Sequence, residues 1–173
     1  MPVHNGQIRK LYPRADAAVL ADDARLSFEG AAGMTYSVRI EDEATGQTVF
    51  EANTRPTTVT VATGILRPGR KYYWEVRPQG ADQPPERRWA EFHTLGAEDT
   101  ARRASLRARL ELIADDEALG LLAEVDRRLG LLSEAAEGFL RALSRSMDQE
   151  PLRRRLKDVE ARLDERHPGD GAR

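Results

Sequence analysis

The spacing of apolar residues changes near residue 96, and this change constrains the fold more than any other feature. Before it, apolar and polar residues alternate, as in YSVRI (36–40) and YYWEV (72–76). A two-residue period places alternate side chains on opposite faces of a strand. After it, apolar residues recur every three or four positions, as along 152–163, which places them on one helix face. The sequence therefore predicts strands before this point and helices after it.

Turn-forming residues divide the first part into short strands. Gly30 to Gly33 follows the strand around Leu26 and Phe28, and Pro68-Gly69 precedes the strand at 70–77. Thr45-Gly46 closes a hairpin between the strands predicted at 36–42 and 47–52. About six or seven strands fit between residues 7 and 95, a number and spacing typical of an antiparallel β-sandwich.

The second part contains about four helices. Gly130 is suited to end the second helix and Ser133 to cap the third, while Pro151 fits the first turn of the fourth. The outer two helices are expected at about 99–114 and 151–165. We therefore expect a β domain over 8–95, a helical segment over 97–166 and a disordered tail over 167–173.

One corner of the β domain carries a recognisable motif. The segment LRPGRKY (66–72) resembles the corner before the sixth strand of fibronectin type III domains, where a leucine, a proline and a tyrosine recur together. The resemblance extends over about 8–95, with Phe28 at the position of the second strand's large aromatic residue. It implies an Ig-like sandwich in which the ring of Tyr72 is buried and its hydroxyl bonds to nearby backbone.

The helical segment resembles a tetratricopeptide repeat. The matching residues are Leu119, Leu122, Ala123, Gly130, Ala135, Phe139 and Ala142. Asp126 and Met147 depart from the pattern, where an aromatic residue and a proline are usual. The resemblance implies two antiparallel helices in close contact, with Phe139 between them. Because a lone repeat cannot bury its own face, the flanking helices are expected to cap it.

Composition and charge exclude several classes of protein. The 173 residues carry a formal net charge of −2, without the basic excess of a general nucleic-acid binder. Cysteine is absent, which excludes disulfides and thiolate metal sites. The sequence has neither an apolar run of membrane-spanning length nor the apolar core of a signal peptide at its start. We therefore expect no membrane insertion, and either a cytoplasmic protein or the soluble extracytoplasmic region of a longer chain.

No motif for catalysis, cofactor binding or metal binding is present. The three histidines, His4, His93 and His167, lack the spacing of a zinc site. No Gly-x-Ser-x-Gly or phosphate-loop motif occurs, and the acidic runs at 41–43 and 115–117 suit a hairpin turn and a helix start. The basic run at 153–157 is followed by acidic residues, which favours surface ion pairs over nucleic-acid contact. We therefore expect neither an enzyme nor a cofactor.

Two surfaces are candidates for binding a partner. If Tyr72 and Phe92 face the core, then Tyr73 and Trp89 face outward on neighbouring strands and can form an exposed aromatic surface. Alternatively, the helices cover these rings or Trp89 folds into the sandwich edge. On the helices, Asp126 and Arg127 are the candidates for a groove that binds a peptide or a partner helix.

These features favour a non-enzymatic module for protein interaction or scaffolding. The order of the two segments is similar to that of soluble regions of bacterial envelope and regulatory proteins, including anti-sigma-factor-like ones. The alternative is a carbohydrate-associated accessory domain that uses the Tyr73/Trp89 surface. The sequence identifies neither the partner nor the oligomeric state.

Overall fold

The computed structural model describes residues 8–14, 17–80, 87–112, 116–145 and 149–164. It divides into two compact units, and we call the unit up to Thr94 the β part and the unit Leu95–Glu165 the helical part. The predicted tail at 167–173 and Met147 lie outside the described residues.

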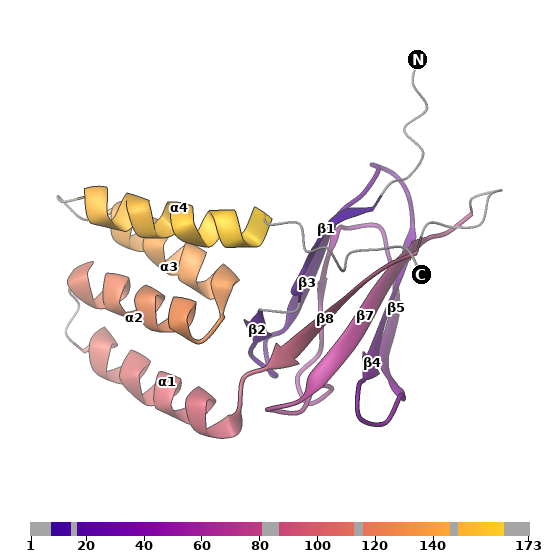
Figure 1. Ribbon diagram of the computed structural model, residues 1–173, viewed down its shortest axis with the longest axis horizontal. Helices are drawn as coiled ribbons and strands as arrows, with labels where there is room; N and C mark the ends of the chain where they lie inside the picture. Colours follow the sequence, from indigo (N-terminus) through magenta and orange to yellow (C-terminus); the bar gives the residue numbers. More distant parts are fainter. Residues whose placement is uncertain (1–7, 15–16, 81–86, 113–115, 146–148, 165–173) are drawn as a thin grey trace, which may run out of the picture. The chain divides into compact units, whose positions relative to one another are not determined.

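The β part contains eight strands in two sheets (Figure 1). The three-stranded sheet has the order β1-β3-β6, formed by β1 (Arg9–Tyr12), β3 (Arg25–Glu29) and β6 (Thr58–Thr60). The five-stranded sheet has the order β2-β8-β7-β4-β5, formed by β2 (Ala18–Val19), β8 (Arg88–Thr94), β7 (Lys71–Pro78), β4 (Tyr36–Asp42) and β5 (Thr48–Thr54).

The two sheets share one apolar core, so the β part is a sandwich. Leu26 and Phe28 come from the first sheet, and Tyr36, Trp74 and Phe92 from the second, all of them buried. The ring of Phe28 meets that of Tyr36 edge to face at 4.9 Å between centroids. The predicted alternation appears along β4, where every other side chain is buried.

The pairing of the strands departs from the predicted antiparallel pattern at one place. β2 pairs in parallel with the end of β8, Ala18 opposite His93 and Val19 opposite Thr94. β1 and β2 belong to different sheets, so the chain crosses from one sheet to the other between them. Just after β1, the carbonyl of Pro13 accepts a 2.8 Å hydrogen bond from Trp74 Nε1 of the second sheet. The other pairings are antiparallel, including the predicted hairpin of β4 and β5.

The turn of this hairpin is organised by one carboxylate. Asp42 Oδ1 accepts hydrogen bonds from the backbone N–H groups of Ala44 and Thr45 at 3.0 and 3.1 Å, the geometry of an Asx-turn. The backbone N–H of Gly46 donates to the carbonyl of Asp42 at 2.8 Å and closes the loop. The Thr45-Gly46 turn was therefore correctly predicted.

The tyrosine motif before β7 has the expected geometry. Tyr72 is buried, and its hydroxyl accepts a 2.8 Å hydrogen bond from the backbone N–H of Arg67. Leu66, at the start of the motif, is also buried. The hydroxyl thus holds the corner against the core.

Removing this hydroxyl should weaken the sandwich. We expect Tyr72→Phe to lower the free energy of unfolding by about 1 kcal/mol, since the Arg67 N–H loses its partner. Urea unfolding followed by tryptophan fluorescence measures this, because both tryptophans lie in the β part. Tyr73→Phe is the matched control, with an expected change below about 0.5 kcal/mol, because the Tyr73 hydroxyl bonds to exposed Glu43. Equal losses of unfolding free energy in Tyr72→Phe and Tyr73→Phe would contradict the role assigned to the Tyr72 hydroxyl.

The helical part contains four helices: α1 (Ala97–Glu111), α2 (Asp116–Arg128), α3 (Leu132–Leu143) and α4 (Glu150–Asp164). Within it, α1 packs on α2, α2 on α3 and α3 on α4. Ala135, Phe139 and Ala142 form the buried face of α3. The stripe predicted on α4 is buried at Leu156 and Val159.

The ends of α2 and α3 agree with the prediction in part. Gly130 has a φ of +79° and follows α2, as expected for a residue that ends a helix in the left-handed region. The predicted cap Ser133 is wrong, because the N-cap of α3 is Leu131 and Ser133 lies inside the helix. The carbonyl of Leu131 accepts a 2.9 Å hydrogen bond from the backbone N–H of Ala135, so the helix has begun before Ser133 is reached.

Candidate functional site

The outward face of β4, β7 and β8 brings together aromatic and charged side chains that are far apart in the sequence. The register places Tyr73 opposite Glu91 and Glu75 opposite Trp89 across β7 and β8. On the other side of β7, Glu41 stands opposite Tyr73. Because residues directly opposite on one face lie within contact distance, these strands present one continuous surface.

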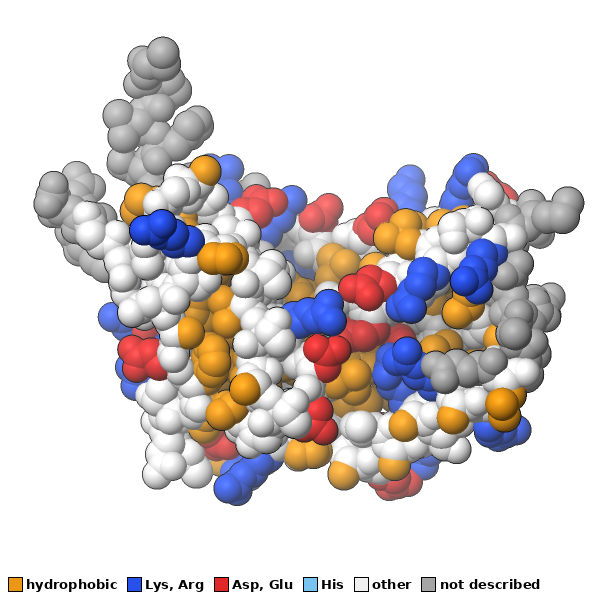
Figure 2. All heavy atoms as spheres, turned by 180° about the vertical axis from the view of Figure 1, so that it is seen from behind, with side chains coloured by type: hydrophobic (Ala, Val, Ile, Leu, Met, Phe, Trp, Pro, Cys, Tyr) orange, Lys and Arg blue, Asp and Glu red, His pale blue; other side chains and the backbone are white. Residues whose placement is uncertain are grey.

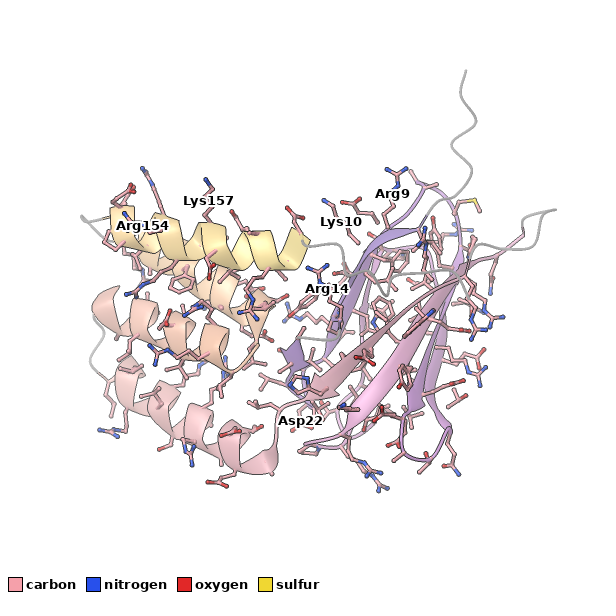
Figure 3. The ribbon with its side chains drawn as sticks, viewed as in Figure 1. Arg9, Lys10, Arg14, Asp22, Arg154 and Lys157 are labelled. Atoms are coloured by element: carbon pink, nitrogen blue, oxygen red, sulfur yellow. The ribbon has the colours of Figure 1, made fainter. Side chains whose placement is uncertain are left out.

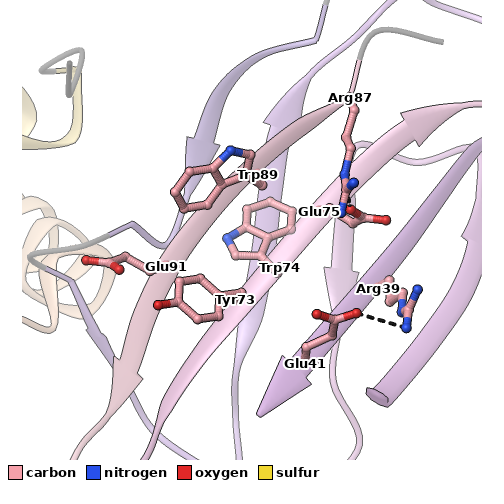
Figure 4. A pocket seen from close by; sticks show the side chains of 8 residues that line it. All are labelled: Arg39, Glu41, Tyr73, Trp74, Glu75, Arg87, Trp89 and Glu91. Carbon is pink, nitrogen blue, oxygen red and sulfur yellow. Dashed lines mark hydrogen bonds and ion pairs between the residues drawn. The ribbon is translucent and has the colours of Figure 1, made fainter. Parts of the chain in front are cut away.

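This surface is hollowed into an open depression of about 480 Å³. We call it the aromatic depression, and Figure 4 shows the side chains around it. Its lining residues come from the β part alone: Arg39, Glu41, Tyr73, Trp74, Glu75, Arg87, Trp89 and Glu91.

Two aromatic rings form one end of the depression. The rings of Tyr73 and Trp89 lie 6.0 Å apart between centroids, with their planes at 66°. The hydroxyl of Tyr73 donates a 3.1 Å hydrogen bond to Glu43 Oε1. The alternation in the sequence correctly predicted that these two rings would share a surface, and each is half-buried. Their role in binding stays a prediction.

The other end of the depression is a network of ion pairs. Glu75 is 8% exposed although it lies on the outward face. One carboxylate oxygen of Glu75 is 2.7 Å from an Arg77 guanidinium nitrogen, and the other bonds to Arg87. Arg39 pairs with Glu41 at 2.8 Å. The sequence analysis did not identify these pairs. Arg39–Glu41 and Arg77–Glu75 each join residues two positions apart on one strand, whereas Arg87 reaches Glu75 from a different segment.

Of the two candidates on the helices, Asp126 lies inside the helical part. Its carboxylate accepts two hydrogen bonds from Arg103, at 2.5 Å from Nε and 2.9 Å from a terminal nitrogen. The two side chains are 4% and 9% exposed. The hydrogen bond to Asp126 raises the pKa of Arg103 and outweighs the opposing effect of burial. Asp126 thus joins α2 to α1. The hydrophobic pattern of the sequence did not indicate that Arg103 would be its partner.

Arg127 lies at the surface and is engaged by two acidic residues. It bonds to both carboxylate oxygens of Glu124, at 2.9 and 3.0 Å, and approaches Asp158 of α4 at 3.4 Å. Hydrogen bonds from Arg127, helped by Arg128, lower the pKa of Glu124 to about 2. These contacts tie α2 to α4 rather than leaving Arg127 to face an open groove.

The lowered pKa of Glu124 makes the helical part sensitive to acid. The ordinary pKa of 4.5 applies to the unfolded chain and about 2 to the folded one, so this stabilisation is complete above about pH 4.5 and is lost as the pH falls through 2. We expect Glu124→Gln to cost about 1 kcal/mol at pH 7, because Arg128 is largely exposed and screening weakens the pairs. Circular dichroism melts at 222 nm between pH 7 and 2 should show a smaller loss of stability with acid for the variant.

Glu137→Gln provides the control for this measurement. Glu137 pairs with Arg141 at 3.8 Å on the same helical part, and both side chains are more than half exposed. Its replacement should change stability by less than about 0.5 kcal/mol. A response to pH that is identical in wild type and Glu124→Gln would refute the assigned role of Glu124.

Two further features of the described residues are the grouping of possible metal ligands and the distribution of charge on one face. Among the described residues, no three His, Asp or Glu side chains lie close enough together to hold a metal ion. Positive and negative side chains are interspersed over the face drawn in Figure 2. In the basic run on α4, Arg154 and Lys157 project away from the helix (Figure 3), and both are exposed.

None of the described helices is long and apolar enough to cross a membrane.

The chain is similar to solved structures over about half of its length. It is similar to a solved structure of CopC from Methylosinus trichosporium OB3b, with 20% identity and a TM-score of 0.42 over 53% of this chain and 95% of that one. It is also similar to a fibronectin type III domain of the human collagen alpha-1(XX) chain, with 21% identity and a TM-score of 0.41 over 53% and 89%. No family model and no curated protein matches the chain. At these levels the similarities assign neither family nor function, and the tetratricopeptide resemblance stays a prediction.

Proposed function

We propose that this chain is a non-enzymatic binding module that docks a segment of another protein in the aromatic depression. The observation that carries the proposal is the Tyr73–Trp89 pair, whose rings line a depression of about 480 Å³ on a rigid sheet. Large, stiff aromatic side chains are the residues most enriched at the energetic centres of protein interfaces. Three paired strands hold them in place, so little conformational entropy is lost when a partner binds.

Two of the three carboxylates that line the depression are held in ion pairs, which supports binding rather than catalysis. A general acid or base must reach the substrate with an oxygen or nitrogen that can exchange a proton. Both oxygens of Glu75 are held by guanidinium groups, and Glu41 is held by Arg39. Such pairs stabilise a fixed surface, and they are suited to form the polar rim of an interface.

The shape of the aromatic pair favours a protein segment over a carbohydrate. Ring planes at 66° form a corner, whereas a sugar ring stacks on a flat, exposed ring face. The helical groove of a tetratricopeptide-like module has less support, because Asp126 is buried and Arg127 is tied to Glu124 and Asp158. A regulatory role in a bacterial envelope stays a prediction, because no contact among the described residues supports it.

Selection from a library of linear random peptides displayed on phage, against the immobilised full chain, tests the proposal. We expect enriched peptides whose affinity falls at least about tenfold when Trp89 is replaced by alanine, the loss of a typical hot-spot residue. Tyr73→Ala should act in the same direction. Because both side chains are only half-buried, neither change removes a core residue.

Two controls separate the depression from other surfaces. Leu121→Ala and Leu140→Ala remove apolar side chains of the helical part that are 51% and 54% exposed, and neither should weaken the selected peptides. Peptides that bind Trp89→Ala unchanged, but lose affinity for the two leucine variants or for Arg127→Ala, would move the site to the helices. Saturable binding of a polysaccharide at Trp89, with no peptide selected, would favour the carbohydrate alternative.

A further inference from the structure

Among the described residues, one carboxylate that lines the aromatic depression has no counter-ion. Arg39 is paired with Glu41, and Arg87 and Arg77 with Glu75. Glu91 makes no ion pair with any residue in the part of the chain that the structure describes. Lys71, which stands diagonally across from Glu91 in the register, does not pair with it either. The negative charge of Glu91 is therefore available to a ligand.

Glu91 lies beside the two aromatic rings. It stands directly opposite Tyr73 on β7 and two residues from Trp89 on β8, so all three side chains emerge from the same face of the sheet. Figure 4 shows them together at one end of the depression, apart from the ion-paired arginines. We call these three residues the aromatic corner.

The chemistry of the corner selects for positive charge. The face of an aromatic ring carries partial negative charge and attracts a Lys ammonium or an Arg guanidinium, with indole the strongest of the rings. Rings at 66° present more than one direction of approach to a cation, and the neighbouring carboxylate adds a direct counter-ion. An anionic group would be repelled by Glu91, and an aliphatic group would leave that carboxylate unpaired as it lost water.

We propose that the aromatic corner is the anchor site for a Lys or Arg side chain of the bound protein segment. The proposal rests on the proposed function, because it names the side chain by which the segment docks. The apolar stem of the basic residue lies along the Tyr73 and Trp89 rings, and its charged end meets Glu91. The arginines of the depression do not compete for Glu91, since Arg39 is paired with Glu41, and Arg77 and Arg87 are both paired with Glu75.

The test uses the peptides selected against the full chain. Each basic residue is replaced in turn, Lys by norleucine and Arg by citrulline, which keeps the length and removes the charge. We expect one position in each peptide to lose about tenfold in affinity, the combined effect of an ion pair and a cation–π contact. The indole N–H signal of Trp89 should shift on binding in NMR spectra, while that of Trp74, bonded to Pro13, should not.

Substitutions in the protein locate the charge effect. Glu91→Gln should weaken the basic peptides by about fivefold and leave their neutral analogues unchanged. Glu51→Gln, an exposed carboxylate on β5 of the same sheet, is the matched control and should have no effect. Glu91→Lys should abolish the preference for basic peptides.

The outcomes separate the two proposals. Peptides that require Trp89 but tolerate norleucine or citrulline at every basic position would overturn the anchor site and leave the proposed function standing. Equal losses of peptide affinity in Glu91→Gln and Glu51→Gln would mean that the charge acts only by long-range attraction. This result would also overturn the anchor site. If no selected peptide requires Trp89, the proposed function fails, and the anchor site fails with it.

Discussion

Replacing Asp126 with alanine is expected to lower the free energy of unfolding of the helical part by about 3–5 kcal/mol, the usual cost of removing one partner from a buried ion pair. Asp126 and Arg103 are 4% and 9% exposed and are joined by two hydrogen bonds. An arginine remains protonated in proteins, so the variant must keep a buried positive charge or move Arg103 into water. Either response loosens the packing of α1 on α2.

Glu134 is the group that can moderate this loss. Burial raises its pKa, and the charge of Arg103 opposes that rise, while Asp126 adds to it. Without Asp126, the carboxylate of Glu134 is repelled less and remains near the arginine. We therefore expect Asp126→Ala combined with Glu134→Ala to cost more than the two single changes together.

Urea unfolding followed by circular dichroism at 222 nm measures these losses. The double variant Arg103→Met, Asp126→Leu provides the control, because it removes both charges and fills the space with apolar atoms. It should recover most of the stability lost in Asp126→Ala. A loss below about 1 kcal/mol for Asp126→Ala would mean that the pair is not buried as described.

Replacing Gly138 with valine is expected to cost about 3 kcal/mol, because α2 and α3 touch at this residue. A Cβ built at Gly138 would lie 2.8 Å from the Cβ of Ala123 and 3.3 Å from its Cα. These atoms belong to a helix backbone and a single methyl group, so no rotamer change can relieve the overlap. The helices would have to move apart and weaken the contacts of the buried Phe139.

Gly138→Ala gives a graded form of this experiment. Alanine favours a helix by about 1 kcal/mol relative to glycine, which offsets part of the steric cost. We expect a net loss of about 1 kcal/mol, and the exchange Ala123→Gly with Gly138→Ala should restore stability by moving the methyl group across the contact. Melting followed by circular dichroism measures all three variants. A stabilised Gly138→Ala would show that the two helices have room at this position.

Much of the fold could be predicted from local patterns. The change of period near residue 96 separated strands from helices, because each period follows from the geometry of its own element. The Thr45-Gly46 hairpin and the Tyr72 corner depend on residues within a few positions of one another, and both have the predicted geometry. The parallel pairing of β2 with β8 was not predicted, because it joins residues more than seventy positions apart.

The candidate site was predicted only in outline. Alternation along β7 and β8 placed Tyr73 and Trp89 on one face, and the structure brings their rings to 6.0 Å. The pattern could not show that β4 is the other neighbour of β7, and so it missed Arg39 and Glu41 in the depression.

The sequence alone determined the order of strands and helices, the turns between many of them and the direction in which Tyr73 and Trp89 point. These follow from backbone geometry and from the separation of apolar and polar side chains over short distances. The tertiary structure decided which charges are neutralised: it buries Asp126 against Arg103, places Glu75 between two arginines and leaves Glu91 beside the aromatic rings. The energy of a charge depends on the distance to its counter-ion and on its access to water, and both are set only when distant segments pack together.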